Sequence, residues 1–327
     1  MCVLMLAGCG FAAQANETFE SMDTFMQINL YGSAGTAAVV RAEIERLDAL
    51  LSATDEHSDV YRLNRDGEAP VDPDTCELLE KTQETCRALD NDLNIFVYPL
   101  VEAWGFIDRN YTIPAPKTIE TLLSAAQNAR LARTETNFLK IEGQDARLDL
   151  GAVAKGYAAD RAIAVMADNG VFSGILNLGG TVAAVGKKPS GELWRVGICD
   201  PDSQSSYFAS VAVSDKIVAT SGSYERYFER GGKRYCHIID PKTGYPVDNG
   251  TVSVTVISDS GFQSDALSTA LFVKGLDGAV QYWRKNGGFE FILLDENNRL
   301  YLTEGIEAAF RMADYYDYEV YVIKASG

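Results

Sequence analysis

The sequence lacks a long apolar run, and it has few histidines and few positive charges. Of its 327 residues only 2 are histidine, and 29 lysines and arginines stand against 46 aspartates and glutamates, a net charge of -17. No stretch approaches the roughly 18 apolar residues of a membrane span, which excludes a polytopic membrane protein. An acidic surface repels phosphate backbones, so nucleic acid is not expected as a partner. With 46% hydrophobic and 23% charged residues, the chain has the composition of a folded globular protein.

The six cysteines include no Cys-x-x-Cys pair, which argues against a zinc ribbon or a thioredoxin-like motif. Cys76 and Cys86 fall in one expected helix. Ten helical residues rise about 15 Å, which is too far for a disulfide. We therefore expect both residues to be ordinary helix residues, and Cys199 and Cys236 to be buried thiols in strands.

The N-terminus carries Leu6-Ala7-Gly8-Cys9, which is similar to the lipobox of a bacterial lipoprotein. We expect residues 1–21 to comprise a truncated export signal, a lipidated Cys9 and a polar tether from Gln14 to Glu20. The basic n-region is missing and the apolar stretch before Gly8 is short. A chance tetrapeptide in a frayed N-terminus is the alternative.

Helical and strand patterns are unevenly distributed along the chain. Helix-like segments come mostly early, at 37–51, 74–90, 118–129, 153–169 and 264–274. Strand-like segments come mostly late, at 27–32, 174–180, 181–186, 194–198, 209–214, 216–220, 251–258, 289–294 and 318–323, with a hairpin expected at 138–150 and a polar loop at 52–64. No regular βαβ rhythm is present. The pattern predicts an α+β protein with mostly antiparallel sheets, in which residues 22–327 form one domain or two intimately packed subdomains.

Two glycine-containing turns are candidates for close contact with an anion. In Asp149-Leu-Gly-Ala-Val-Ala-Lys155 an expected strand turns into a helix, and the N–H groups of a helix start together with Lys155 suit a phosphate. The spacing matches neither a Walker loop nor a Rossmann fingerprint, and an ordinary turn with a solvated lysine is an equal alternative. In Asn177-Leu-Gly-Gly-Thr181 the double glycine allows a close backbone approach, or simply a tight turn.

His237 and Asp265 belong to two further candidate sites. His237 stands just before a Pro/Gly turn and suits proton transfer or contact with phosphate, unless turn carbonyls hold its ring. Asp265, Ser268 and Thr269 have the spacing of one helix face. A carboxylate with hydroxyls is an oxygen set that suits Mg²⁺, although helix capping would also explain these residues.

Taken together, these motifs resemble the ApbE family of FAD:protein FMN transferases over about residues 22–274. The matching segments are Leu51 to Asn64, Pro99 to Phe106, Asp149 to Asp160, Leu178 to Gly180, Trp194 to Pro201, Thr220 to Tyr227, His237 to Pro246 and Asp265 to Thr269. The resemblance implies an ApbE-like, T-fold-related architecture. It also implies Mg²⁺-dependent transfer of FMN from FAD to a Thr or Ser hydroxyl of a target flavoprotein, with release of AMP.

The resemblance assigns roles to individual residues. The implied metal ligands are the backbone of Ala152 and the side chains of Asp265, Ser268 and Thr269. The residues implied at FAD are Met22, Thr54, Asp92, Leu93, Asn94, Asp149, Lys155 and Ile239, with Lys155 at a phosphate. His237 matches the family's histidine and is the catalytic candidate, through proton transfer or phosphate contact.

Three positions depart from the family pattern. Asp23 stands where glycine is usual, Asn94 where aspartate is usual, and Thr54 where many members carry an aromatic residue that covers the flavin. A less covered flavin favours water as the acceptor. A metal-dependent FAD pyrophosphatase, forming FMN and AMP, is therefore the alternative activity. A non-catalytic FAD-binding lipoprotein is the alternative outside enzymes, but storage of FAD needs no metal.

The resemblance also implies partners and a location. The acceptor would be an exported FMN-binding-domain protein, or a subunit of a sodium-pumping quinone reductase or Rnf-type complex. We therefore expect the protein at the extracytoplasmic face of a bacterial cell envelope, anchored by lipid at Cys9.

Overall fold

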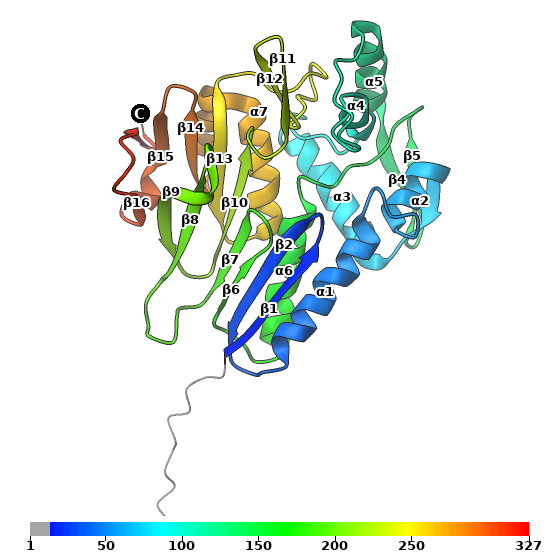
Figure 1. Cartoon of the computed structure of the whole chain (residues 1–327). Coiled ribbons are helices and arrows are strands. Elements are labelled where there is room, and N and C mark those ends of the chain that lie inside the picture. The colour runs from blue at the N-terminus through cyan, green and yellow to red at the C-terminus, as the bar shows by residue number, and fades with distance from the viewer. Residues whose placement is uncertain (1–13, 327) are drawn as a thin grey trace, which may run out of the picture.

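A nine-stranded sheet organises the computed structural model, which describes residues 14–326 (Figure 1). Its strands, in spatial order, are β1 (Gln14–Ser21), β2 (Thr24–Tyr31), β6 (Gly174–Asn177), β7 (Thr181–Val185), β10 (Lys216–Gly222), β13 (Thr251–Ser258), β14 (Glu290–Asp295), β15 (Arg299–Thr303) and β17 (Glu319–Ile323). All neighbours pair antiparallel except β15 and β17, which are parallel. The predicted α+β class with mostly antiparallel sheet is confirmed.

Three helices cover one face of this sheet: α1 (Thr36–Leu51), α6 (Ala154–Asp168) and α7 (Gly261–Asn286) (Figure 1). Val40, Ile44 and Leu47 recur at helical spacing along α1, and all three are fully buried against the sheet. The helix starts of α6 and α7 meet at Gly156 and Gly261. A Cβ on Gly156 would lie 2.1 Å from the carbonyl oxygen of Gly261, so only glycine allows this approach.

The other face of the sheet packs against a small sheet of β8 (Trp194–Asp200), β9 (Ser203–Val213) and β16 (Phe310–Met312). Side chains of a strand alternate between the two faces. Along β14, Phe291 and Leu293 therefore pack toward the helices, whereas Ile292 and Leu294 pack toward this second sheet. The middle strands of the central sheet are thus buried on both faces, which explains the nearly continuous apolar runs of β13 and β14.

The remaining elements gather at one end of the central sheet (Figure 1). They are α2 (Asp59–Asp66), β3 (Glu68–Pro70), α3 (Pro73–Ala88), α4 (Tyr98–Ala103), α5 (Pro116–Asn128), β4 (Arg130–Glu135), β5 (Phe138–Glu142) and the hairpin of β11 (Tyr227–Arg230) and β12 (Lys233–Cys236). A short 3₁₀ helix, η1 (Glu304–Ile306), follows β15. Loops between these elements lie over one end of the inner strands β2, β7 and β10, where the candidate site is found.

Four expectations about local structure are corrected. The stretch from Gln14 to Glu20 is not a tether, because β1 pairs with β2 along its whole length and buries Ala15 and Phe19. The expected loop 52–64 contains α2, which Ser58 caps by accepting a hydrogen bond from the Tyr61 N–H. The expected hairpin 138–150 is instead β4 paired with β5, and the expected helix at 264–274 is part of the longer α7.

The cysteine predictions can be compared with the structure where it describes them. Cys76 and Cys86 are buried thiols in α3, as expected, and Cys236 is a buried thiol at the end of β12. Cys199 lies in β8 but is only partly buried. The lipobox and Cys9 lie outside the described residues. Within residues 14–326, no helix combines the length and apolarity needed to cross a membrane.

Candidate functional site

A cavity of about 980 Å³ brings together nearly all of the predicted site residues. The predicted residues that line it are Met22, Asp92, Leu93, Asn94, Asp149, Ala152, Lys155, His237, Ile239, Asp265, Ser268 and Thr269. They come from segments far apart in the sequence. The volume is at the upper end of the range for small-molecule sites, which fits an extended ligand.

Thr54 is the predicted site residue that does not line this cavity. It is exposed in the loop between α1 and α2, where its Oγ1 lies 3.2 Å from the Ser52 Oγ. The Ser52 Oγ also accepts the backbone N–H groups of Thr54 and Asp55. These local bonds close the loop on itself, and the structure does not bring Thr54 into the cavity with the other predicted residues.

Several cavity residues were not assigned roles from the sequence. Phe25 lies on β2 with 73% of its surface exposed, and Arg109, Glu225 and Arg226 also line the cavity. Glu225 and Arg226 belong to the segment Thr220 to Tyr227, which contributed to the family resemblance. That motif pointed to this loop, but nothing in its spacing showed which of its side chains face the cavity.

Asp265 is the most deeply placed carboxylate of the site, with 6% of its surface exposed. Its Oδ2 accepts the backbone N–H of Gly156 at 2.5 Å, and its Oδ1 accepts the Thr181 hydroxyl at 2.6 Å. Burial raises the pKa of Asp265, whereas the nearby Lys155 ammonium and these two hydrogen bonds lower it. The structure therefore pulls a carboxylate out of water without giving it a direct ion-pair partner among the described residues.

Capping of its own helix does not explain Asp265, although its carboxylate does accept the Gly156 N–H in the first turn of α6. The N-cap of α7 is Ser260, whose side chain accepts the Gln263 N–H. Asp160, reaching over from α6, accepts the N–H groups of Gly261 and Phe262. Because other side chains satisfy this helix start, the capping alternative for Asp265 is wrong.

Hydroxyl groups surround Asp265 on the cavity wall. The Ser221 Oγ on β10 lies 2.8 Å from the Ser268 Oγ and 3.1 Å from the Thr269 Oγ1. The Ser268 hydroxyl also donates to the Asp265 carbonyl at 2.9 Å. The predicted grouping of Asp265, Ser268 and Thr269 on one side of α7 is thus present in the cavity.

These residues fit a hard cation. In the described part of the chain no three His, Cys, Asp or Glu side chains cluster as metal ligands. Asp265 is instead a single buried carboxylate among hydroxyl oxygens, and each of its oxygens keeps a second lone pair. Mg²⁺ commonly takes one or two carboxylates and fills its other positions with water and substrate phosphate, so this donor set suits Mg²⁺ better than zinc.

The turn from Asp149 into α6 supplies the neighbouring wall. The Asp149 Oδ1 accepts the Gly151 N–H at 2.7 Å and thereby closes the turn that presents Ala152 to the cavity. Lys155 follows in the first turn of α6. Its ammonium acts electrostatically on Asp265, Glu225 and His237, which places it centrally among the titratable groups.

Asp92 is anchored by two lysines from distant segments. Its Oδ1 accepts the Lys242 ammonium at 2.6 Å, and its Oδ2 pairs with Lys274 of α7. Asp92 is 4% exposed, so the pair of cations neutralises a carboxylate that is almost fully buried. We interpret Asp92 as a group that holds the cavity wall in place, because both of its oxygens are occupied.

Met22 and Asp23 form the tight turn between β1 and β2 at the cavity. Both have positive φ values, 49° and 58°, as a two-residue hairpin turn of the primed type requires. Asp48 secures the turn by accepting the Met22 N–H at 2.8 Å and the Ser21 hydroxyl at 2.9 Å. The family's usual glycine would adopt the φ of Asp23 without strain, and aspartate tolerates it.

Asn94 uses its side chain to shape the loop that follows Asp92. Its Oδ1 accepts the Phe96 N–H at 2.8 Å, and its Nδ2 donates to the Ala126 carbonyl at 3.2 Å. The amide thus makes one bond that a carboxylate could also accept and one that needs a donor. Asparagine suits this environment better than the family's usual aspartate.

His237 lies at the base of the β11–β12 hairpin, on the cavity wall. Its backbone N–H donates to the Arg226 carbonyl at 2.9 Å, and its Nδ1 lies 3.3 Å from the same oxygen. Burial, together with the cations of Arg226 and Lys155, lowers the pKa of His237 to about 3. The imidazole is therefore neutral at physiological pH, which argues against an imidazolium that donates to phosphate.

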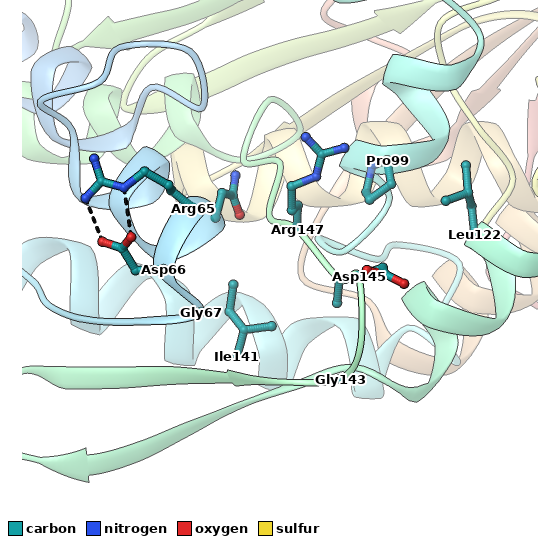
Figure 2. A pocket seen from close by; sticks show the side chains of 11 residues that line it. Arg65, Asp66, Gly67, Pro99, Leu122, Ile141, Gly143, Asp145 and Arg147 are labelled. Atoms are coloured by element: carbon teal, nitrogen blue, oxygen red, sulfur yellow. Dashed lines mark hydrogen bonds and ion pairs between the residues drawn. The ribbon is translucent and has the colours of Figure 1, made fainter.

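A second, smaller cavity of about 440 Å³ lies between α2, α4 and β5 (Figure 2). Arg65 and Asp66 pair at its wall at 2.6 Å, and Arg147 pairs with Glu102. None of the predicted site residues lines this cavity. Its arginines are already neutralised within the protein, so it is not a candidate for the site.

The low pKa of His237 predicts how stability depends on pH. Between pH 6.5 and about pH 3 the unfolded chain binds a proton that the native imidazole does not, so His237 makes the fold less stable as pH falls. At pH 5 this loss amounts to at most about 2 kcal/mol. Urea unfolding at pH 7.5 and pH 5 should therefore show a smaller acid-induced loss for His237→Gln than for the wild type.

The second histidine provides the control. The side chain of His57 is 86% exposed, so His57→Gln should follow the wild type at both pH values. Equal losses for His237→Gln and the wild type would show that His237 titrates normally in the folded protein.

Comparisons with known proteins agree with this geometry. The model of the ApbE family matches residues 22–293. A curated FAD:protein FMN transferase from Klebsiella pneumoniae is 32% identical over 83% of this chain and 85% of its own length, and one from Treponema pallidum is 30% identical over 96% and 94%. The crystal structure of an ApbE protein from Thermotoga maritima is 29% identical, covers 91% of this chain and all of its own, and superposes with a TM-score of 0.83. The chain belongs to the ApbE family.

Proposed function

We propose that this protein is an enzyme that transfers FMN from FAD to a target flavoprotein, with AMP as the second product. The observation that carries the proposal is the cavity itself, in which Asp265 with its neighbouring hydroxyls faces the same space as Lys155. Family membership adds the reaction class, because the curated relatives are FAD:protein FMN transferases. Splitting FAD at its pyrophosphate leaves FMN for the acceptor and releases AMP.

Different residues of the cavity would bind the metal, bind the phosphate and hold the cavity walls in place. Mg²⁺, when bound, would neutralise pyrophosphate charge and favour attack at phosphorus. Asp265, Thr269, Ser268 and the backbone of Ala152 would hold it. Lys155 would pair with a phosphate oxygen, as its place in the first turn of a helix favours. Asp92 and Asp149 maintain the walls through the bonds described above.

The acceptor group we propose is a Thr or Ser hydroxyl of the target protein. The target would be an exported FMN-binding-domain protein or a subunit of a sodium-pumping quinone reductase or Rnf-type complex. Release of FMN to water, as in an FAD pyrophosphatase, is the alternative activity, and it would use the same cavity. Hydrolysis remains an outcome of the test below.

The acceptor proposal predicts a covalent flavin on the target. Co-expression with a recombinant FMN-binding domain should yield a target peptide whose Thr or Ser carries FMN through a phosphoester, as read by peptide mass spectrometry. Replacing that Thr or Ser with Ala should abolish the adduct. Formation of free FMN and AMP, with the target unmodified, would identify the protein as a hydrolase.

The metal proposal predicts that Asp265→Ala abolishes turnover, because Mg²⁺ loses the only anionic side chain among its proposed ligands. AMP release from FAD should be followed over a range of Mg²⁺ concentrations. Asp259→Asn is a matched control, since Asp259 is an exposed carboxylate near the start of α7 that pairs with Lys216. It should keep wild-type activity. Undiminished Asp265→Ala activity at limiting Mg²⁺ would count decisively against the assignment.

We also propose that the protein is held by lipid at Cys9 on the extracytoplasmic face of a bacterial envelope. The support is the lipobox-like Leu6-Ala7-Gly8-Cys9 in the sequence. Expressed behind a complete signal peptide, the wild type should fractionate with membranes, and Cys9→Ser should appear in the soluble fraction. A Cys9→Ser variant that stays with the membranes would refute the lipid anchor.

A further inference from the structure

Transfer to a hydroxyl releases the hydroxyl proton, and three of the six carboxylates that line the cavity are already engaged. Both oxygens of Asp92 bind lysines, and both oxygens of Asp265 accept hydrogen bonds. Asp149 accepts the Gly151 N–H and maintains a turn. Protonation of any of these three carboxylates would weaken its ion pairs, its hydrogen bonds or its proposed metal contact.

His237 is poorly suited to hold the proton. Its Nδ1 lies against the Arg226 carbonyl, and the cations of Arg226 and Lys155 oppose a positive charge on the ring. The resulting pKa of about 3 means that an imidazolium in this place would be a strong acid. A proton acceptor works best when its pKa lies nearer the working pH.

Glu225 differs from these three carboxylates in having no such bond. Glu20 and Asp23 also line the cavity without a described side-chain bond, but they lie at the β1–β2 turn, whereas Glu225 is within electrostatic reach of Lys155 and Asp265. Glu225 lies in the loop between β10 and β11 and lines the cavity. Within residues 14–326, its side chain makes no described hydrogen bond or ion pair. Its Oε1 lies 3.8 Å from the point where a Cβ on Gly180 would stand. The next residue after Gly180 is Thr181, whose hydroxyl binds Asp265.

This position puts an unengaged carboxylate beside the end of the cavity where we place the metal. The double glycine before Thr181 has no side chains, so it leaves the Glu225 carboxylate room to move toward a ligand. Glu225 can therefore approach a nucleophile at phosphorus without breaking any bond within the protein. The loop that carries it is held by backbone contacts: the Ser223 N–H donates to the Val252 carbonyl at 3.0 Å, and the Arg226 carbonyl accepts the His237 N–H at 2.9 Å.

We propose that Glu225 accepts the proton of the acceptor hydroxyl during FMN transfer. The inference rests on the proposed function, in which a hydroxyl is the acceptor. The hydroxyl oxygen forms a bond to the FMN phosphorus, and the bond from that phosphorus to the bridging oxygen of the pyrophosphate breaks. The bridging oxygen leaves with its electron pair as part of AMP. The proton passes to the Glu225 carboxylate and then to solvent, which balances the step.

The charges that face Glu225 support this role. The cavity walls disfavour a charged carboxylate and raise the pKa of Glu225 above its ordinary value, while Lys155 of α6 and the adjacent Arg226 lower it and Asp265 of α7 raises it. Activity that needs the deprotonated carboxylate should fall as pH is lowered through this raised pKa. Burial also raises the pKa of Asp265, so the acidic limb belongs to Glu225 only if it disappears in a Glu225 variant.

The test compares Glu225→Gln, Glu225→Asp and Glu225→Ala with the wild type, using FAD, Mg²⁺ and a recombinant FMN-binding domain. AMP release measures kcat, and quenching of flavin fluorescence measures the Kd for FAD. Glu225→Gln should lower kcat on the order of 10²- to 10⁴-fold, with a much smaller change in Kd. It should also lose the acidic limb of the pH profile, and Glu225→Asp should retain part of the activity.

A rescue experiment separates proton transfer from a structural role. Formate, but not chloride, should restore turnover to Glu225→Ala, because a small carboxylate can occupy the vacated space and take the proton. Glu229→Gln is the matched control, since Glu229 lies on β11 outside the cavity and pairs with Arg234. It should keep the wild-type kcat and pH profile.

Each outcome bears on one proposal or on both. A Glu225→Gln variant with wild-type kcat would overturn the role of Glu225 alone. So would a Kd for FAD that rises as steeply as kcat falls, since Glu225 would then bind FAD. Wild-type protein that releases no AMP from FAD would overturn the proposed function, and the role of Glu225 with it.

Discussion

The site depends on one buried carboxylate that ties three elements together. Asp265 of α7 accepts the Gly156 N–H from α6 and the Thr181 hydroxyl from β7. A hydrogen bond to an ionised acceptor is stronger than one between neutral groups. These two contacts therefore hold α7 against the start of α6 and the start of β7. The close contact of Gly156 with Gly261 makes the geometry possible, because any side chain at either position would push α6 and α7 apart.

This arrangement has a cost that points to its use. A carboxylate removed from water needs a compensating cation, since hydrogen bonds alone recover only part of its hydration energy. Asp92 shows how the same chain meets that need elsewhere, with a lysine on each oxygen. Asp265 has no such lysine in contact, although it is almost as deeply buried, with 6% of its surface exposed against 4% for Asp92. We therefore interpret Asp92, which is paired with two lysines, as a structural group. Asp265, which has no cation in contact within the described chain, is the carboxylate left to bind a ligand.

The parts of the fold that could be predicted from sequence are those with strong local patterns. Apolar spacing identified α1, α3, α5 and α6 closely, and β13 was predicted with its exact bounds because β-branched residues run through it. The strand β1 was missed because Asn16, Glu17 and Glu20 make it polar outside Ala15 and Phe19. Pairing with β2 and packing against α1 stabilise it, and neither contact is visible in its own sequence. The helix α2 was missed because its sequence is polar, and Ser58 was not recognised as the N-cap of a helix.

The candidate site was predictable where motifs carried it and not where contacts between distant segments decide it. The structure brings Asp265, Lys155 and His237 to one cavity, whereas Thr54 lies outside it, because its position depends on how the α1–α2 loop closes. The pairing of Asp92 with Lys274 joins residues 182 positions apart, and no local pattern reports it. The low pKa of His237 likewise depends on Arg226 and Lys155 arriving from two other segments.

The charge of the cavity wall also favours a bound cation. Its acidic residues outnumber its basic ones: Glu20, Asp23, Asp92, Asp149, Glu225 and Asp265 stand against Arg109, Lys155 and Arg226. The protein as a whole is also strongly acidic. A pyrophosphate would meet net repulsion here, both locally and from the whole molecule. Lysines 242 and 274 neutralise Asp92, but the other five carboxylates of the cavity still outnumber its three cationic residues. The same surplus of carboxylate that repels a dinucleotide alone would attract a dinucleotide carried with Mg²⁺, so the metal and FAD are expected to bind cooperatively.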